Sequence, residues 1–266
     1  VYRQNPTALR QLQKSNIEIR YQQGLADEFK KALERGRNYI PYMEQVFLEH
    51  NLPIELTRLV FVESMFQLNA TSKYGAKGLW QIMKATAKPH LHITKIIDER
   101  TSPYKSTKLA ASMFKRLYKK LNSWPLTITA YNHGIRGVEN AIRTIKSNKL
   151  EDIISRYQSK SFKFASRNFY YEFVAAVNTY NKLKTNRVLP QRQNIEMLEL
   201  KKPTSINKLL TAGKISENIL RKFNPDIKKN AFIKPRNQKL PATYQIYLPT
   251  KYMFSFKKNI MESGLL

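Results

Sequence analysis

The chain has 266 residues, 42% of them hydrophobic, which is enough to bury the core of one large or two modest domains. It contains no cysteine, which excludes disulfides, thiolate metal sites and thiol nucleophiles. Its 47 Lys and Arg residues against 19 Asp and Glu give a net charge of +28. We therefore expect a polyanionic partner, and both nucleic acid and an anionic cell wall fit that expectation.

Two further features concern membranes and export. No apolar run reaches the roughly 18 to 20 residues that span a bilayer, so we expect a soluble protein without a transmembrane segment. The first residues, VYRQNPTALRQ, lack the apolar core of a signal peptide, and we expect that any such segment is absent from this chain.

Apolar residues recur at helical spacing through the first two thirds of the chain. Residues 7–50 predict one or two helices, and the pattern stays helical, without strand alternation, to residue 184. The expected helices there are 53–67, 78–87, 107–121, 125–132, 135–147, 150–157 and 167–184. Glycines occur in the pairs Gly75 with Gly78 and Gly134 with Gly137, which predict two tight turns.

The expected helix 53–67 contains an acid in an apolar setting. Pro53 is favoured at a first helical position. One face of this helix comprises Leu56, Leu59, Val60 and Glu63. A buried carboxyl without a cation stays protonated, because burial penalises its charged form. Glu63 is therefore a candidate proton donor, and the alternative is an ionised glutamate that reaches solvent or pairs with Arg58.

The composition changes after residue 184. The polar stretch 185–193 predicts a linker. A strand at 195–200, helices at 203–213 and 216–225, and a strand at 243–249 then predict a small separate module.

Three short motifs follow one another in the helical region: Glu63-Ser64, then GAKGLWQ (75–81), then AYNHG (130–134). In this order they resemble the signature of lytic transglycosylases with the goose-type lysozyme (SLT) fold, and the flanking sequence is most similar to the membrane-bound D type. The resemblance covers about residues 30–184. It implies a mainly α protein, with N-terminal helices (1–50), an SLT domain (51–184), the linker (185–193) and an α+β LysM-like module (194–266) whose relatives bind glycans containing N-acetylglucosamine.

The resemblance also implies roles for single residues. Glu63 matches the family's catalytic acid, which protonates the glycosidic oxygen between N-acetylmuramic acid and N-acetylglucosamine. The positions that match substrate-binding residues are Ser72, Gln81, Met83, Tyr131, Asn132 and Tyr170. For Tyr170, the family's Glu-Thr-Arg lead-in is replaced here by Ala165-Ser166-Arg167.

The number of acids favours one reaction over another. Hydrolysing glycosidases generally use two carboxylates, and the next acids after Glu63 are Asp98 and Glu99, in a segment that looks structural. We therefore expect a peptidoglycan lytic transglycosylase that forms 1,6-anhydro ends. The alternatives are a lysozyme-like hydrolase of the same bond, in acetylated or deacetylated wall, and a non-catalytic wall-binding protein.

The remaining expectations concern partners and location. We expect no metal and no cofactor, since His90 and His92 have no neighbouring carboxylates in the sequence and no phosphate-binding glycine loop is present. The basic surface should hold anionic wall polymers rather than nucleic acid. The resemblance implies a secreted or periplasmic protein, which we expect to be a monomer.

Overall fold

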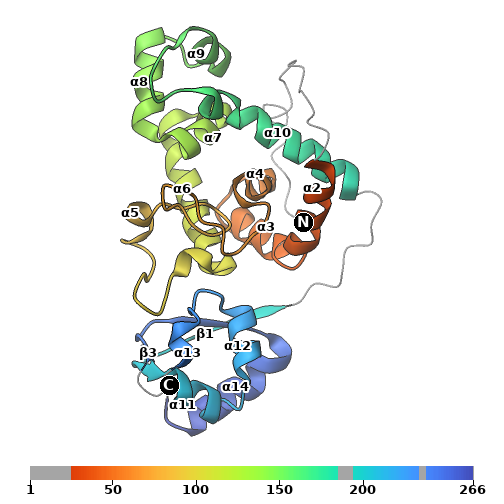
Figure 1. The fold of residues 1–266 in the computed structure, drawn as a ribbon, viewed down its shortest axis with the longest axis vertical. Helices are drawn as coiled ribbons and strands as arrows, with labels where there is room; N and C mark the ends of the chain where they lie inside the picture. The colour runs from red at the N-terminus through yellow and green to blue at the C-terminus, as the bar shows by residue number, and fades with distance from the viewer. Residues whose placement is uncertain (1–24, 185–193, 234–237, 266) are drawn as a thin grey trace. The chain divides into compact units, whose positions relative to one another are not determined.

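The computed structural model describes residues 25–184, 194–233 and 238–265 (Figure 1). Contacts divide the chain into two compact units. The first unit consists of Val1–Phe66 and Thr107–Leu189, and the second of Gln67–Ser106 and Pro190–Leu266. Both units are therefore discontinuous in sequence. The predicted helical stretch before residue 25 and the predicted linker 185–193 lie outside the described residues.

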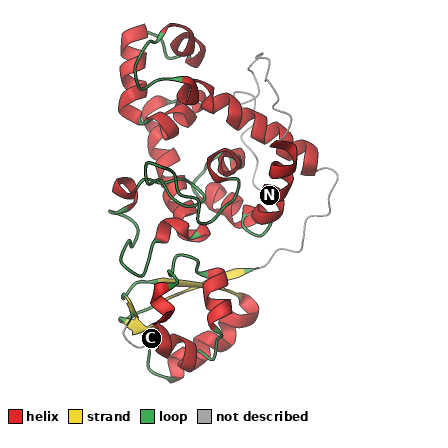
Figure 2. Ribbon diagram, in the orientation of Figure 1, coloured by secondary structure: helices red, strands yellow, loops and turns green. Residues whose placement is uncertain are grey.

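The first unit is built from helices (Figure 2). They are α2 (Leu25–Gly36), α3 (Ile40–Glu49), the 3-10 helix η1 (Ile54–Arg58), α4 (Leu59–Ser64), α6 (Pro103–Leu121), α7 (Trp124–His133), α8 (Ile135–Ile145), α9 (Leu150–Arg156) and α10 (Phe164–Lys184). The first residues of α6 belong to the second unit. The long helix α10 packs against α7, α4 and η1, so it forms the framework on which the short α4 rests.

Aromatic rings form the core around α4. Phe61 stacks on Phe29 of α2 with ring centroids 4.2 Å apart, and it contacts Phe66 at 4.7 Å and Tyr180 of α10 at 6.0 Å. Such pairs add to the stabilisation from buried apolar area. The guanidinium of Arg58 lies 3.8 Å from the centre of the Tyr180 ring. This packing holds α4 against α2 and α10.

Two predicted helices are shorter than expected. The stretch 53–67 forms η1 and then α4, which ends because Met65 and Phe66 adopt positive φ angles of 48° and 57°. In the stretch 78–87 only α5 (Lys84–Ala87) is helical. The first half of this stretch is a turn instead. Gln81 has a φ angle of 46°, and the backbone of Lys77 forms a β-bridge with Ile82. Helical spacing of apolar residues predicted continuous helices in both places, but left-handed backbone ends a helix.

The second unit combines short strands and helices. It contains α5, the 3-10 helix η2 (Glu99–Thr101), β1 (Ile195–Glu199), β2 (Thr204–Ser205), α11 (Ile206–Ala212), α12 (Glu217–Phe223), α13 (Asn230–Ile233), β3 (Lys239–Leu240), β4 (Gln245–Pro249) and α14 (Thr250–Glu262). Strands β1 and β4 pair antiparallel, as do β2 and β3. Ser205 and Ser216 accept backbone hydrogen bonds as the N-caps of α11 and α12.

The predicted strand, helix, helix, strand order is present in β1, α11, α12 and β4, and α14 is an addition that the sequence pattern did not indicate. The side chain of Asn224 links a helix to a strand in this unit. It is fully buried, donates to the carbonyl of Tyr247 at 2.9 Å and accepts from the Tyr247 N–H at 2.8 Å. It thus joins the end of α12 to β4. Among the described residues, no helix is both long and apolar enough to cross a membrane.

Candidate active site

Glu63 is the next-to-last residue of α4 and is half-buried. The preceding residues Leu59, Val60 and Phe61 are fully buried, so the helix carries the carboxyl group on an apolar support. Burial, and secondarily the negative charge of Glu172, raise the pKa of Glu63 to about 8. Below that pH the carboxyl group holds its proton, as a general acid must.

The sequence left open an ion pair between Glu63 and Arg58. In the structure, Arg58 is buried and its guanidinium pairs with the Glu44 carboxylate while it covers the Tyr180 ring. Among the described residues, no Lys, Arg or His forms an ion pair with Glu63. The cation that could have kept Glu63 ionised is therefore engaged elsewhere.

Tyr131 is the aromatic neighbour of this acid. It lies in α7, where its ring stacks almost parallel on Phe114 of α6, with centroids 4.7 Å apart. Burial, and secondarily the charge of Glu63, raise the pKa of Tyr131 well above its usual range. The charge of Glu63 therefore acts on Tyr131, and the raised pKa keeps Tyr131 a phenol that can donate a hydrogen bond.

The next residues of the same motif form a hydrogen-bonded group. The Ser166 hydroxyl donates to Oδ1 of the exposed Asn132 at 3.3 Å and lies 3.1 Å from Nδ1 of His133. Burial lowers the pKa of His133, whose ring meets Phe162 edge-on. Gly134 has φ 89° and ψ 142°, a conformation open almost only to glycine, and it ends α7. Ser166 thus fixes Asn132, a role that the sequence analysis did not assign.

Glu172 is a second carboxylate that the sequence analysis missed. It lies on α10 with part of its side chain open to solvent, partial desolvation of its carboxyl group raises its pKa, and its charge acts on Glu63. No local motif marks it, and it follows Glu63 by more than a hundred residues. Only the packing of α10 against α4 brings the two carboxylates into one electrostatic environment.

Tyr170, the residue expected to contact substrate, lies on another side of α10. It is buried, and its pKa is raised to about 12 by burial and then by the charges of Glu151 and Tyr171. Two residues along a helix correspond to a rotation of about 200°, so Tyr170 and Glu172 point in different directions. A role for Tyr170 in substrate binding stays a prediction.

The predicted residues Ser72 and Gln81 belong to a loop of the second unit. The Ser72 hydroxyl oxygen accepts hydrogen bonds from the N–H groups of Tyr74 at 3.3 Å and Ala76 at 3.1 Å. The Gln81 side-chain amide donates to the carbonyls of Ala70 at 3.2 Å and Gly78 at 2.9 Å. Both side chains therefore define the shape of the loop.

Glycine is required at position 78 of this loop. Gly78 has φ 79°, and a Cβ atom built on it would lie 1.9 Å from the carbonyl oxygen of Arg100. The side chain of Arg100 donates to the carbonyls of Gly75 at 2.8 Å and Ile82 at 3.2 Å. Trp80 is fully buried, whereas Met83, the third predicted residue of this part of the chain, is 44% exposed at the start of α5.

The first unit thus brings together a protonated carboxyl group, a phenol and a second carboxylate, which is a set suited to proton transfer. The second unit carries Ser72, Gln81 and Met83. Among the residues that the structure describes, no group of three or more His, Cys, Asp or Glu side chains is placed to hold a metal ion.

Comparison with known proteins identifies the region around these motifs. Residues 48–154 match the family described as the transglycosylase SLT domain. Membrane-bound lytic murein transglycosylase D of Escherichia coli K12 is 30% identical over 200 residues, covering 73% of this chain and 44% of that protein. A protein of Alteromonas sp. M-1 named for tributyltin chloride resistance is 35% identical over 122 residues, covering 45% of this chain and 58% of that protein.

Among solved structures, an inactive mutant of the lytic transglycosylase Slt from Pseudomonas aeruginosa aligns with a TM-score of 0.44 at 19% identity, over 55% of this chain and 24% of that one. The chain spans less than half the length of the Escherichia coli relative. Residues 48–154 are therefore a transglycosylase SLT domain, in a chain homologous to membrane-bound lytic murein transglycosylase D.

Proposed function

We propose that this protein is a lytic transglycosylase that cleaves the β-1,4 bond between N-acetylmuramic acid and N-acetylglucosamine in peptidoglycan, with Glu63 as its acid and base. The observation that carries the proposal is a carboxyl group with a pKa of about 8 inside an SLT domain. The homologous murein transglycosylase supports the substrate. An acid kept protonated at neutral pH also argues against a protein that only binds the wall, since binding does not need one.

In the proposed reaction, Glu63 first gives its proton to the glycosidic oxygen, and the bond from that oxygen to C1 of the muramic acid breaks. The Glu63 carboxylate then takes the proton of the C6 hydroxyl group while the C6 oxygen attacks C1. A 1,6-anhydro ring forms, Glu63 regains its proton and no water is consumed. Tyr131, which remains a phenol, is the candidate to stabilise the Glu63 carboxylate between the two steps.

Glu172 favours a second candidate function, hydrolysis. Hydrolysing glycosidases generally use two carboxylates, and Glu172 is a second carboxylate that acts on Glu63. In a lysozyme-like reaction, Glu63 would again protonate the leaving oxygen, and Glu172 would activate a water molecule. The product would be a reducing muramic acid end, which carries one water molecule more than the anhydro product.

Mass spectrometry of fragments released from purified peptidoglycan in water labelled with oxygen-18 separates the two functions. If the protein is a transglycosylase, the fragments should carry anhydro ends without oxygen-18. If it is a hydrolase, they should carry reducing ends that contain oxygen-18. Glu172→Gln adds a second measurement, with Glu139→Gln on the exposed face of α8 as the matched control. If Glu172→Gln abolishes release while Glu139→Gln does not, and the label is incorporated, the hydrolase interpretation replaces the proposal.

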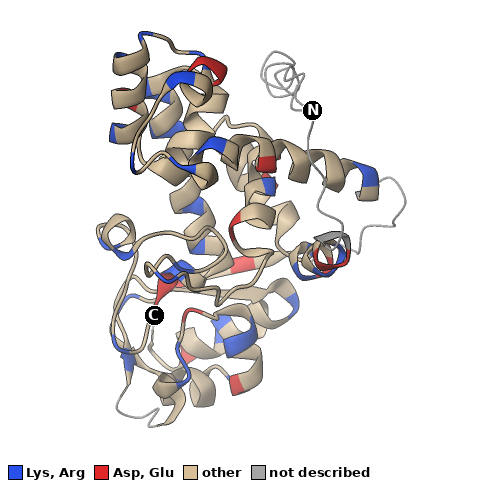
Figure 3. Cartoon of the chain, turned by 45° about the horizontal axis from the view of Figure 1, so that its top comes forward, with Lys and Arg blue, Asp and Glu red and all other residues tan. Residues whose placement is uncertain are grey.

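The basic surface fits an anionic substrate. Lys and Arg occur on many elements of the chain and greatly outnumber Asp and Glu (Figure 3). As part of the proposal, this surface holds the protein on anionic wall polymers outside the cytoplasm, and the LysM-like part of the second unit binds glycan. Adsorption through net charge weakens as salt shortens the Debye length from about 10 Å at 0.1 M to about 3 Å at 1 M.

A further inference from the structure

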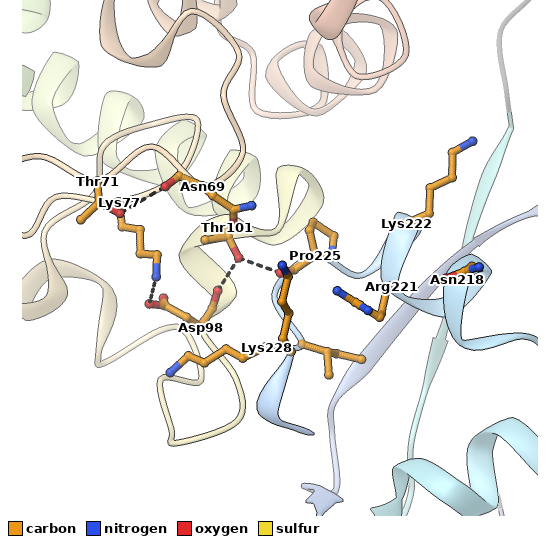
Figure 4. A pocket seen from close by; sticks show the side chains of 12 residues that line it. Asn69, Thr71, Lys77, Asp98, Thr101, Asn218, Arg221, Lys222, Pro225 and Lys228 are labelled. Carbon is orange, nitrogen blue, oxygen red and sulfur yellow. Dashed lines mark hydrogen bonds and ion pairs between the residues drawn. The ribbon is translucent and has the colours of Figure 1, made fainter. Parts of the chain in front are cut away.

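The second unit contains a polar pocket of about 630 Å³, which the proposed reaction does not use (Figure 4). One side is formed by Lys77, Asp98 and their neighbours in the loops before α6, and the opposite side by Asn218, Arg221 and Lys222 of α12 (Figure 4). The segment from Pro225 to Lys229 connects the two sides.

Hydrogen bonds within the second unit build this pocket. The Asp98 N–H donates to the carbonyl of Asp226 at 2.9 Å, and the Lys228 N–H donates to the carbonyl of Ile96 at 2.9 Å. The Thr101 hydroxyl contacts the carbonyls of Asp98 at 2.9 Å and Pro225 at 3.2 Å. The walls are therefore held by backbone contacts.

The pocket has an excess of positive charge. Its lining includes the basic residues Lys77, Arg221, Lys222, Lys228 and Lys229, against the single acid Asp98. Asp98 is already paired with Arg100 at 2.9 Å and with Lys77 at 3.5 Å, so its charge is neutralised within the wall.

Some of the basic side chains that line the pocket already have partners within the protein, and others do not. Arg221 pairs with Glu217 at 2.9 Å, and the Lys228 ammonium donates to the carbonyl of Thr94 at 2.6 Å. Burial lowers the pKa of Lys228, the charge of Asp98 opposes this shift, and the neighbouring cations add to it. Lys222 and Lys229 are exposed and form no ion pair with any described residue. These two ammonium groups are available to a ligand.

The polar neighbours indicate which anion fits. Asn69 and Asn218 also line the pocket, and each side-chain amide offers both a donor and an acceptor. Such groups match the N–H and C=O groups of a peptide, whereas a phosphate polymer has no N–H to donate. Pro225 and Ile227 add apolar surface for small side chains.

We propose that this pocket binds the carboxylate groups of the peptide stems of peptidoglycan, which rests on the wall being the substrate. The ammonium groups of Lys222 and Lys229 hold the carboxylates, and the amides of Asn69 and Asn218 contact the peptide groups. Every lining residue belongs to the second unit, whereas Glu63 belongs to the first. Peptide binding can therefore be measured without the glycosidic reaction.

The test uses the full chain and isothermal titration with an N-acetylated peptide of alanine and glutamate that has free carboxylates. The comparison ligand is the same peptide with all carboxylates amidated. Lys222→Gln with Lys229→Gln is the pocket variant. The matched control, Lys239→Gln with Lys257→Gln, removes the same charge from exposed positions of the second unit outside the pocket.

We expect the acidic peptide to bind, and amidation or the pocket variant to weaken binding at least about tenfold, as loss of charge-assisted hydrogen bonds does. The control should stay within about twofold, because it changes net charge without touching the ligand. Equal losses in both variants would overturn the proposal in favour of net charge. Tighter binding of a glycerol phosphate oligomer through the same lysines would overturn it in favour of a phosphate polymer.

The outcome is independent of the proposed function. A chain that binds the peptide and releases no wall fragments refutes the glycosidic reaction and leaves the pocket assignment standing. A chain that releases fragments and does not bind the peptide refutes the pocket assignment alone.

Discussion

Glu63 of the first unit and Asp98 of the second lie in opposite electrostatic environments. In the first unit, Glu63 is half-buried without an ion pair to any described residue, and its pKa rises to about 8. In the second unit, burial alone would raise the pKa of Asp98, but hydrogen bonds and charges from Arg100 and Lys77 outweigh it and the pKa falls. The same chemical group thus keeps its proton at neutral pH in one unit and is ionised in the other.

The second unit also contains buried acids that are paired with a cation. The buried Lys105 ammonium lies 2.9 Å from the Glu99 carboxylate and 2.8 Å from the Asp226 carboxylate. The Tyr244 hydroxyl donates to Asp226 at 2.6 Å. Buried charges need partners of this kind, because desolvation otherwise costs several kcal/mol per ion. Glu63 has no such partner among the described residues, and this is why it keeps its proton near neutral pH.

The largest expected effect comes from removing the proton donor. Glu63→Gln keeps the shape of the side chain and cannot donate a proton, so wall lysis should fall by several powers of ten, on the scale of a lost general acid that also acts as a base. Release of soluble fragments from peptidoglycan measures the effect, with circular dichroism to check the fold. Substantial lysis by a folded Glu63→Gln protein would contradict the assignment.

Removing the shared cation of the second unit should be the most damaging change to stability. Lys105→Met leaves the carboxylates of Glu99 and Asp226 without their common partner, and breaking a buried pair in this way costs about 3 to 5 kcal/mol. Denaturant unfolding of the full chain measures the loss. Loss below about 1 kcal/mol would mean that water or another cation already serves these acids.

Stability against pH distinguishes the two kinds of acid. The pKa of Glu63 is about 8 in the folded chain and 4.5 in its ordinary state, so the folded chain holds more protons between these values. Its stability therefore falls as pH rises from about 4.5 through 8. Glu63→Gln removes this loss and should be more stable than the unchanged chain above pH 8, on the order of a few kcal/mol. Parallel stability curves for the two proteins would show that Glu63 ionises normally.

The smallest expected effect concerns the second carboxylate. Activity should fall as pH rises through about 8, because Glu63 then loses its proton. Glu172→Gln removes a negative charge that raises the pKa of Glu63, so this alkaline limb should move to lower pH. Fragment release measured across pH tests it, and Glu139→Gln should leave the limb in place. An unmoved limb in Glu172→Gln would mean that the two carboxylates do not interact.

The sequence by itself determined the helices with long amphipathic patterns, such as 107–121 and 135–147, and the acid Glu63 on an apolar helix face. It also located both glycine turns, because a positive φ restricts the residue type wherever it occurs, as at Gly78 and Gly134. The order of the motifs was enough to identify the SLT domain. All of these are local properties, or properties of short segments read in order.

Only the tertiary structure decided which charges meet. The coupling of Glu172 to Glu63 depends on how α10 packs against α4, and the pairing of Lys105 with Asp226 joins residues far apart in the chain. The turn at Gln81 replaced a predicted helix because its side chain and Arg100 bind backbone carbonyls of the loop. Electrostatic energy depends on distance in space and on burial, and neither is encoded in the spacing of residues along the sequence.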